Sequence, residues 1–310
     1  MTSPAGRWLP AYLMLALIWG NSFLLIKLGL ESLTPAGVVL SRLVLGAVAM
    51  LAISAITQSP LPPLRLWGHM FVAALLMTTI GWLLFAFSEQ YISSSLAGIL
   101  NGATPLMTLV VIIIAFPEEK PTRERVVGLL IGFVGIVTVV GIWQGLGAAT
   151  WLGVGACVLA VTSYGISFPY VRRYLATGDG RMGPMTFATA LMIMGAIQVA
   201  PVAAVTGYSH SPLTLTVVLA MVALGAVGSG IAYVLNYVVI HRSDATTAST
   251  VTYVITVVAV ISGSVFLGEH ISWNQPVGAA LVILGAAIAQ GVLRLPGSRP
   301  AIPSETTARP

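Results

Sequence analysis

Polar side chains that could hydrogen-bond a solute interrupt several long apolar segments of this sequence. Asn101 shares one helical face with Thr104 and Thr108, and Asn236 follows Tyr233 by about one turn. An amide or phenol is costly to bury without a partner, whereas a lone hydroxyl often only bonds a neighbouring helix. We therefore predict a binding cavity for a polar solute, lined by Trp19, Asn21, Thr79, Trp82, Asn101, Ser163, Tyr233, Asn236 and Tyr253.

Two tryptophans near the middle of apolar segments could stack a substrate. Trp19 and Trp82 lie far from the segment ends, and Thr78 and Thr79 come one turn before Trp82. An indole N–H in the middle of a bilayer needs a partner or a water-lined cavity, and its ring can hold an aromatic or cationic group. Core packing explains these two positions equally well. The other tryptophans stand at segment ends, where a membrane interface favours them: Trp8, Trp67, Trp143, Trp151 and Trp273.

Charged side chains are few within the apolar segments. Arg42 lies inside the second one, where it either snorkels to the interface or binds a substrate carboxylate. Glu89 and Lys27 stand at segment ends. Because no Asp or Glu is predicted near the mid-plane, the sequence favours facilitated diffusion or exchange over proton coupling. Titration of Glu89, His69 or His241 at a rim stays open as an alternative.

These side chains belong to a chain with the composition of a membrane protein. Of its 310 residues, 57% are hydrophobic and only 7% are charged, whereas soluble domains carry about 25% charged residues. This excludes an ordinary soluble globule and a disordered chain. Apolar stretches of about 20 residues also argue against a β-barrel, whose strands span roughly 10. The single cysteine, Cys157, excludes an intramolecular disulfide.

The apolar segments predict ten transmembrane helices in an all-α fold. They lie at 10–30, 35–57, 66–89, 94–116, 125–143, 151–173, 184–206, 213–238, 245–267 and 275–293. Turn-forming residues connect them, for example at 59–63 and 178–180. Residues 296–310 are rich in Pro, Ser and Thr and are predicted to form a disordered cytoplasmic tail.

The distribution of Lys and Arg predicts the orientation in the membrane. With a cytoplasmic N-terminus, twelve of the 14 basic residues fall in inside segments: Arg7, Arg65, Lys120, Arg123, Arg125, Arg172, Arg173, Arg181, Arg242, Arg294, Arg299 and Arg309. Lys27 alone falls outside. Both termini are therefore expected in the cytoplasm, and the net charge of +5 indicates loop topology rather than nucleic-acid binding.

The chain also contains an internal repeat. A shift of 150 residues pairs five identities within 20 positions: Phe116 with Phe266, Glu119 with Glu269, Val127 with Val277, Gly128 with Gly278, and Gly135 with Gly285. A shift of 145 pairs Gly20, Ser22 and Phe23 with Gly165, Ser167 and Phe168. Each copy holds five predicted spans, so the second copy enters the membrane from the opposite side. Secondary transporters use such inverted repeats to alternate a central site between two faces.

The motifs resemble the drug/metabolite transporter superfamily, and within it the ten-span EamA-domain family. They are Trp19-Gly20-x-x-Phe23, Pro35, Arg42, Pro105 and Glu119-x-x-Thr122 followed by Gly128. The resemblance implies two inverted five-helix halves, 1–145 and 146–295, with spans 1, 3, 4, 6, 8 and 9 around a central cavity and spans 5 and 10 at the periphery. It further implies export of small organic solutes, and this chain is most similar to the branch that exports aromatic and other amino acids. Ile255 stands where the first half has Pro105, and Tyr164 where it has Trp19.

Several features could serve either gating or structure. Pro105 and Pro169 are candidate hinges or static kinks. Thr122 and Ser272 are predicted N-caps, with Gln275 completing a capping box, which would put Glu119 and Glu269 near positive helix ends. Gly128 and Gly132 allow close helix packing within the fold or in a dimer, and we expect a monomer or weak dimer.

Other classes of protein fit less well. An intramembrane aspartyl protease needs two Asp residues within spans, but Asp179 and Asp244 fall in loops. Clusters with metal-ligand spacing and Gly-rich phosphate loops are missing from the sequence. We therefore expect no enzyme, cofactor, metal or nucleic-acid partner. A channel would need a filter from symmetric subunits. The expected function is export of small metabolites, chiefly amino acids, across the cell (inner) membrane, with multidrug or lipophilic-cation efflux as the alternative.

Overall fold

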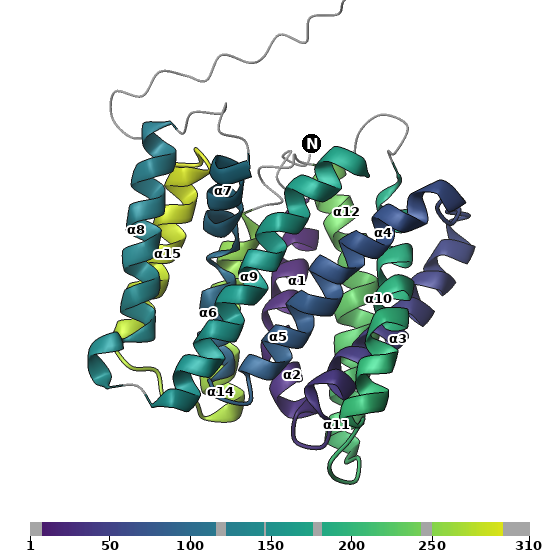
Figure 1. Ribbon diagram of the computed structural model, residues 1–310, viewed down its shortest axis with the longest axis horizontal. Coiled ribbons are helices and arrows are strands. Elements are labelled where there is room, and N and C mark those ends of the chain that lie inside the picture. Colours follow the sequence, from purple (N-terminus) through teal and green to yellow (C-terminus); the bar gives the residue numbers. More distant parts are fainter. Residues whose placement is uncertain (1–7, 116–121, 146, 176–181, 243–249, 294–310) are drawn as a thin grey trace, which may run out of the picture.

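The computed structural model describes residues 8–115, 122–145, 147–175, 182–242 and 250–293. Glu119, Asp179, Asp244 and the predicted tail at 296–310 lie outside these ranges. Within them the chain forms a bundle of helices (Figure 1), and the single strand-like feature described is an isolated bridge between Leu33 and Ser209.

Most of the predicted membrane segments are continuous or nearly continuous apolar helices. Eight helical stretches of 21 to 28 residues are long and apolar enough to cross a bilayer. Two shorter apolar helices follow, Val251–Leu267 and Asn274–Ala289. Each of the ten predicted segments coincides with one of these stretches to within a few residues, except that the ninth helix is described only from Val251.

Five of the stretches are divided into shorter elements. The first half of the chain contains α1 (Leu9–Gly20), α2 (Ser22–Gly29), α3 (Pro35–Ile56), η2 (Leu64–Leu66), α4 (Trp67–Ala74), η3 (Leu75–Ile80), α5 (Gly81–Ser88), α6 (Ser94–Asn101), α7 (Thr104–Ala115), α8 (Arg123–Val140) and η4 (Ile142–Gln144). The second half contains α9 (Ala148–Tyr174), α10 (Pro184–Thr206), α11 (Leu215–Val222), η6 (Ala223–Ile231), α12 (Ala232–Arg242), α14 (Val251–Leu267) and α15 (Asn274–Ala289).

Two of these elements, η3 and η6, are π-helices in the third and eighth stretches. A π-helical turn bonds residues five apart and leaves backbone carbonyls open to other partners. The Leu76 carbonyl of η3 accepts from Ser163 Oγ, and the Gly228 carbonyl of η6 accepts from Trp19 Nε1. Each π-helix is thereby tied to a helix of the other half of the chain, α9 and α1 respectively.

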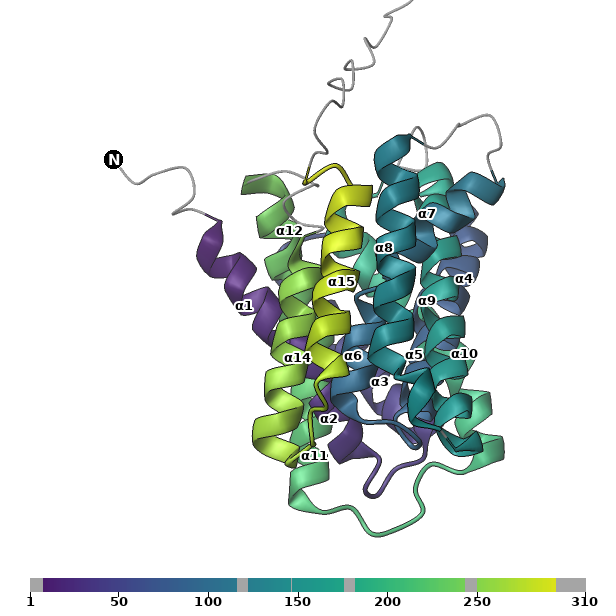
Figure 2. The ribbon, with the colours of Figure 1, turned by 90° about the vertical axis from the view of Figure 1, so that its left-hand side faces the viewer.

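Helices α8 and α15 lie side by side at one edge of the bundle (Figures 1 and 2). A Cβ atom at Gly128 would overlap the backbone of Gly285, and one at Gly135 would overlap the backbone of Gly278. The glycines predicted from the repeat therefore bring the two backbones into contact, as small residues do between membrane helices. Gly128 and Gly132 serve packing within the chain here.

The buried side chains form two large clusters. One joins α1, α6, α9 and α14, and the other joins α3, α4, α10 and α11. Tyr164 of α9 packs against both. Helix α6 packs chiefly on α14, whereas α7 packs chiefly on α9, so the two parts of the fourth stretch have different main neighbours.

The predicted helix caps are met only in part. Thr122 caps α8, since its Oγ1 accepts from the Arg125 amide. The prediction for Ser272 is wrong: α15 begins after Trp273 without a side-chain cap, and the Gln275 Oε1 atom has no hydrogen-bond partner in the described chain. Glu269 accordingly does not sit at the start of α15.

Candidate functional site

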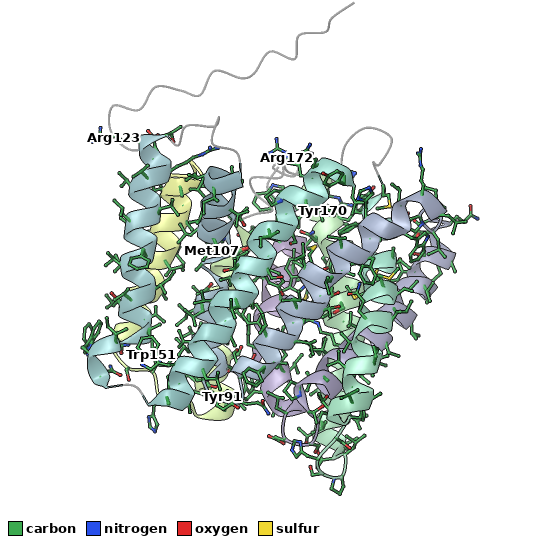
Figure 3. All side chains as sticks on the ribbon, viewed as in Figure 1. Tyr91, Met107, Arg123, Trp151, Tyr170 and Arg172 are labelled. Atoms are coloured by element: carbon green, nitrogen blue, oxygen red, sulfur yellow. The ribbon has the colours of Figure 1, made fainter. Side chains whose placement is uncertain are left out.

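A cavity of about 1660 Å³ occupies the middle of the bundle and opens at one end. Its lining reaches the helix ends at Thr122, Met182, His241 and Gly291, which we call the open end. We call the opposite end, at Lys27, Glu89, Ser94, Ser95 and Glu269, the closed end; none of these residues lines the cavity. Figure 3 shows Arg123 and Arg172 toward the open end and Tyr91 and Trp151 toward the closed one.

Aromatic rings form much of the cavity wall. Trp19 and Tyr233 meet edge to face with centroids 5.9 Å apart, and the Trp19 N–H is used by the Gly228 carbonyl at 3.1 Å. Tyr164 packs against Phe85, with centroids 5.8 Å apart. Such rings supply a large apolar contact area with defined edges and faces.

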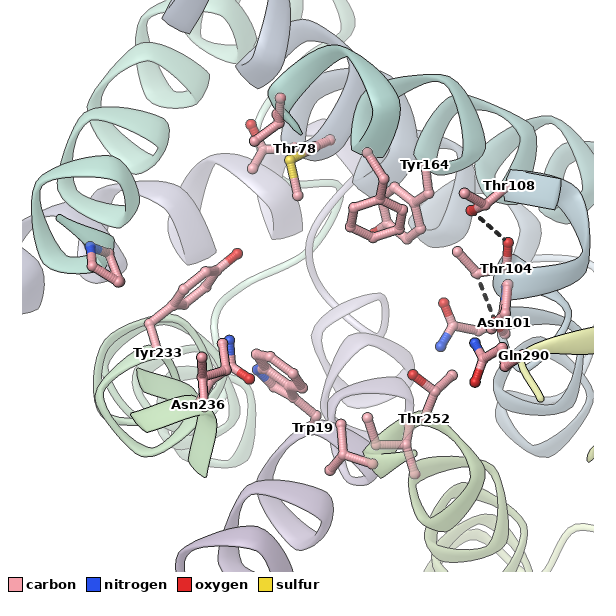
Figure 4. A pocket seen from close by; sticks show the side chains of 18 of the residues that line it. Trp19, Thr78, Asn101, Thr104, Thr108, Tyr164, Tyr233, Asn236, Thr252 and Gln290 are labelled. Carbon is pink, nitrogen blue, oxygen red and sulfur yellow. Dashed lines mark hydrogen bonds between the residues drawn. The ribbon is translucent and has the colours of Figure 1, made fainter. Parts of the chain in front are cut away.

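Free amide groups lie on opposite sides of the cavity (Figure 4). Tyr233 and Asn236 face it from α12, and Asn101 faces it from the end of α6, close to Gln290. Within the described chain, the side-chain amides of Asn101 and Asn236 have no hydrogen-bond partner. Gln290 Oε1 accepts from the Tyr253 hydroxyl at 2.6 Å. Amides without a protein partner are available to water or to a bound solute.

Arg42 of α3 also lines the cavity, although only 8% of its surface is exposed. Its Nε donates to the Ser229 hydroxyl at 3.0 Å, and its guanidinium carbon lies 3.7 Å from the centroid of the Trp82 ring. This is a cation–π contact in a largely desolvated site. The other acidic or basic side chains of the lining are nearer the open end: Glu124, Arg125 and His241.

The break between α6 and α7 borders the cavity. Asn101 ends α6, Thr104 begins α7 and donates back to the Asn101 carbonyl at 2.7 Å, and Pro105 lines the cavity. Because proline lacks an N–H, the helix cannot continue its bonding through this point. Pro169, the other predicted hinge, lies inside continuous α9 and away from the cavity lining.

Five of the predicted binding residues line the cavity: Trp19, Trp82, Asn101, Tyr233 and Asn236. Four lie elsewhere. Asn21 bonds the Leu17 carbonyl of its own helix, Thr79 donates to Gln198 Oε1 at 2.6 Å, Ser163 donates to the Leu76 carbonyl, and Tyr253 bonds Gln290. These four side chains are used within or between helices.

The sequence prediction missed several lining residues. Thr252 and Gln290 face the cavity, and Phe187 comes from stretch seven, which the family resemblance did not place around it. Arg42, which the sequence left open between snorkelling and binding a substrate carboxylate, also lines the cavity, from stretch two. Gln290 follows the last residue of α15 and was hidden at the end of an apolar segment. Arg42 was visible as the lone cation within a predicted span, but its direction was not.

The closed end is sealed by polar bonds between helices. The Glu269 carboxylate accepts from the Ser94 amide at 2.7 Å, the Ser95 amide at 2.9 Å and the Ser95 hydroxyl at 2.5 Å. It thereby occupies the positive N-terminus of α6. Burial raises the pKa of Glu269, but the hydrogen bonds from Ser95 and Ser94 together outweigh burial and hold it below its ordinary value.

A second polar contact lies beside it. Lys27 Nζ donates to the backbone carbonyls of Glu89 and Ile92. The Glu89 carboxyl is fully buried, and within the described residues neither of its oxygens has a hydrogen-bond partner. Burial raises the pKa of Glu89 well above its ordinary value, while the nearby Lys27 opposes this shift.

Comparison with known proteins assigns the chain to a family. The EamA-like transporter family matches the chain twice, over residues 6–141 and again over residues 151–290. The chain belongs to the EamA-like transporter family. It is a multi-pass membrane protein, and the family's name agrees with a central cavity lined by helices from both matched stretches.

Relatives from distant organisms carry the same kind of name. A protein from Archaeoglobus fulgidus named as an uncharacterized transporter is 24% identical over 274 residues, covering 87% of this chain and 94% of its own. YhbE of Escherichia coli, named as an uncharacterized inner membrane transporter, is 30% identical over 190 residues, covering 57% of this chain and 58% of its own. These names point to transport rather than catalysis.

A solved crystal structure has the same fold. It superposes with a TM-score of 0.64 at 18% identity and covers 94% of this chain and 99% of its own. At this identity the likeness concerns the fold alone.

Proposed function

We propose that this protein is a secondary carrier of the inner membrane that exports small metabolites, chiefly amino acids including aromatic ones, by alternating access. The observation that carries the proposal is the cavity itself. It opens at one end, has aromatic walls, and presents the free amides of Asn101 and Asn236 together with the cation of Arg42. Trp19, Trp82 and Tyr233 would contact the apolar part of a substrate. The relatives named as inner membrane transporters support the location.

The proposed mechanism uses two inverted halves, residues 1–145 and 146–295, as a ten-span unit. Three observations support it. The family matches the chain twice, the π-helices occur in the third and eighth stretches, and the glycine pairs between α8 and α15 are exchanged as a two-fold relation requires. Inverted halves can form a cavity that opens to either face in turn. Pro105, at the break between α6 and α7, is the proposed hinge.

The orientation follows from charge. The described basic residues Arg125, Arg172 and Arg242 belong to the open end, whereas Lys27 lies at the closed end. Under the positive-inside rule the open end and both termini are cytoplasmic. In this conformation the cavity would therefore load from the cytoplasm, as an exporter requires.

Efflux of lipophilic cations is the alternative function. It is less well supported, because the one acidic side chain in the described lining is Glu124 near the open end. The Trp82 face, which could hold a cation, is already covered by Arg42. A lining without a carboxylate near its middle also supports facilitated diffusion or exchange rather than proton coupling.

Uptake of a labelled amino-acid panel into proteoliposomes without an ion or pH gradient tests the proposal. We expect saturable entry of aromatic amino acids above protein-free vesicles, and faster entry when the vesicles are preloaded with the same unlabelled amino acid. Entry of a lipophilic cation with no entry of any amino acid would overturn the proposed substrate. Entry that rises linearly with concentration would overturn the carrier mechanism.

A further inference from the structure

Arg42 is held in one orientation by three elements of the fold. Its own helix α3 packs tightly on η6, since a Cβ atom at Gly225 would overlap Leu45 and approach the Arg42 backbone. Ser229 of η6 accepts from Nε, and Trp82 of α5 lies beneath the guanidinium plane. A guanidinium fixed in this way is already organised for a ligand, because little side-chain freedom remains to be lost.

This cation has no counter-ion in the described chain. No carboxylate there lies within ion-pair distance of Arg42, and neither oxygen of the buried Glu89 carboxyl makes a hydrogen bond to it. The two terminal nitrogens of the guanidinium likewise have no protein acceptor among the described residues. A buried charge without a partner is costly, and arginine keeps its proton in proteins. The positive charge of Arg42 is therefore not compensated by the described chain, which favours binding of an anion.

The free edge of Arg42 borders the cavity beside aromatic rings. Tyr164, Tyr233 and Trp19 line the same cavity as Arg42. Arginine binds carboxylates through two parallel N–H···O bonds. A carboxylate at this edge would leave an attached aromatic or aliphatic group among the rings.

The described part of the same lining has no side chain that would bind a substrate ammonium group as Arg42 would bind a carboxylate. Among the described lining residues the acid is Glu124, at the start of α8 near the open end. Asn101 and Asn236 can accept hydrogen bonds from an ammonium group, but they carry no charge.

We propose that Arg42 binds the carboxylate of the substrate and that the cavity requires this carboxylate but not an ammonium group. The substrates are then aromatic or aliphatic carboxylates, both amino acids and the corresponding acids without nitrogen. This inference rests on the proposed transport function and names the chemical feature by which the site selects its substrates.

The wild-type carrier provides the first test. Uptake of labelled phenylalanine into proteoliposomes is measured with three unlabelled competitors: 3-phenylpropionate, which has only the carboxylate, phenethylamine, which has only the ammonium, and phenylalaninamide, whose carboxylate is blocked. We expect 3-phenylpropionate to compete about as well as phenylalanine. Because a hydrogen bond to a charged group contributes about 1.5–3 kcal/mol, the other two should compete roughly tenfold to a hundredfold more weakly. Equal competition by phenethylamine would overturn the proposal.

Variants of Arg42 provide the second test. We expect Arg42→Gln to weaken 3-phenylpropionate binding roughly tenfold or more. Arg42→Lys should weaken it less, since lysine keeps the positive charge but lacks the two parallel N–H donors of arginine. Arg123→Gln removes one exposed positive charge at the start of α8, outside the cavity lining, and is the matched control, with affinity expected to stay unchanged. Equal weakening by Arg42→Gln and Arg123→Gln would overturn the proposal.

A binding measurement separates this inference from the function on which it rests. Thermal unfolding of the purified wild-type protein in detergent is followed with 3-phenylpropionate or phenethylamine present. Stabilisation by 3-phenylpropionate alone, without saturable amino-acid uptake in vesicles, would remove the proposed function and support the carboxylate site. Saturable uptake with stabilisation by phenethylamine instead would support the function and overturn the role of Arg42.

Discussion

The two ends of the cavity differ in how the helices around them meet. At the closed end α14 lies against α6, and Glu269 bonds the first amides of α6. Toward the open end α7 packs on α9 instead, and within the cavity the side-chain amides of Asn101 and Asn236 have no partner in the described chain. The closed end is thus held by a few charge-assisted bonds and by small residues in contact. These are contacts that a carrier can break and remake, whereas a large apolar interface would hold one state.

Backbone contact at the closed end should be the most sensitive feature. A Cβ atom at Gly263 of α14 would overlap Ser95 and the Glu269 carboxylate. We expect Gly263→Leu to prevent closure and reduce exchange to the level of protein-free vesicles, because overpacking a tight contact costs about 1–3 kcal/mol and the seal has no room to relax. The distance between spin labels at Tyr91→Cys and His270→Cys should increase.

A matched glycine controls for the added side chain. Gly155 of α9 has open space around its missing Cβ atom, so Gly155→Leu should leave exchange and the label distance unchanged. The native Cys157 is buried and should label poorly. Normal exchange by Gly263→Leu would show that the closed end does not need this contact.

Removing the charge of Glu269 should have the next largest effect. Glu269→Gln keeps the size of the side chain but loses the ionised acceptor of the two α6 amides. A hydrogen bond to a charged group contributes about 1.5–3 kcal/mol, so the ratio of closed to open molecules should fall roughly tenfold or more. The same spin-label pair measures this as a second, longer distance. Glu31→Gln, an exposed neutralisation in the loop after α2, should give a single unchanged distance.

The pH response should differ between the two acids of the closed end, the buried Glu89 and the half-buried Glu269. The depressed pKa of Glu269 means that its contribution to the seal is complete above the ordinary value of about 4.3 and is lost as pH falls through its lowered pKa. The raised pKa of Glu89 works in the opposite direction. Its bound proton stabilises this state below the ordinary value, and that contribution is lost as pH rises through the raised pKa.

We therefore expect most molecules to show the short label distance at mildly acidic pH. The fraction that shows it should decrease both below and above that range. Glu89→Gln should remove only the alkaline decline, because a glutamine resembles the protonated acid. The groups that act on Glu89 are Lys27, Glu269 and Arg42, so their variants shift the alkaline limb but should not abolish it. An unchanged alkaline decline in Glu89→Gln would assign it to another group.

The smallest expected effects separate cavity residues from structural ones. Asn101→Ala and Asn236→Ala remove amides without protein partners, so substrate affinity should fall about twofold to tenfold, at 0.5–1.5 kcal/mol per neutral bond, with little change in unfolding temperature. Thr79→Val breaks the bond to Gln198 and should lower the unfolding temperature without changing affinity. Competition uptake and thermal unfolding in detergent check the two halves of this prediction. The reverse pattern would mean that Thr79, not the amides, meets the substrate.

Much of the topology could be predicted from local sequence. Segments such as 184–206 coincide with a helix because about 20 consecutive apolar residues have few alternatives in a bilayer. Thr122 was recognisable as an N-cap because capping depends on residues three apart. Ser272 fits the same sequence pattern but does not cap a helix, because α15 begins at Asn274. The side-chain amide of Asn274 donates to the backbone carbonyls of Thr138 and Val139, which are distant in sequence.

The direction of each side chain about its helix was beyond the sequence. Thr79 and Asn101 are both polar residues within apolar stretches, yet one bonds Gln198 and the other faces the cavity. In a soluble protein the polar face of a helix shows which side is buried. In a membrane both lipid and core are apolar, so that signal is weak.

The sequence by itself determined where the chain forms apolar helices and which of its segments carry the positive charges, and it predicted an internal repeat. Each of these depends on composition over a stretch or on residue identity at fixed spacing. Only the tertiary structure decided that Arg42 lies over Trp82 beside the cavity. The same holds for the hydrogen bonds that Trp19 and Ser163 donate to carbonyls of the π-helices, and for the bond that Glu269 accepts from the first amide of α6. Those contacts join residues far apart in the chain, and they depend on how helices rotate and pack against one another.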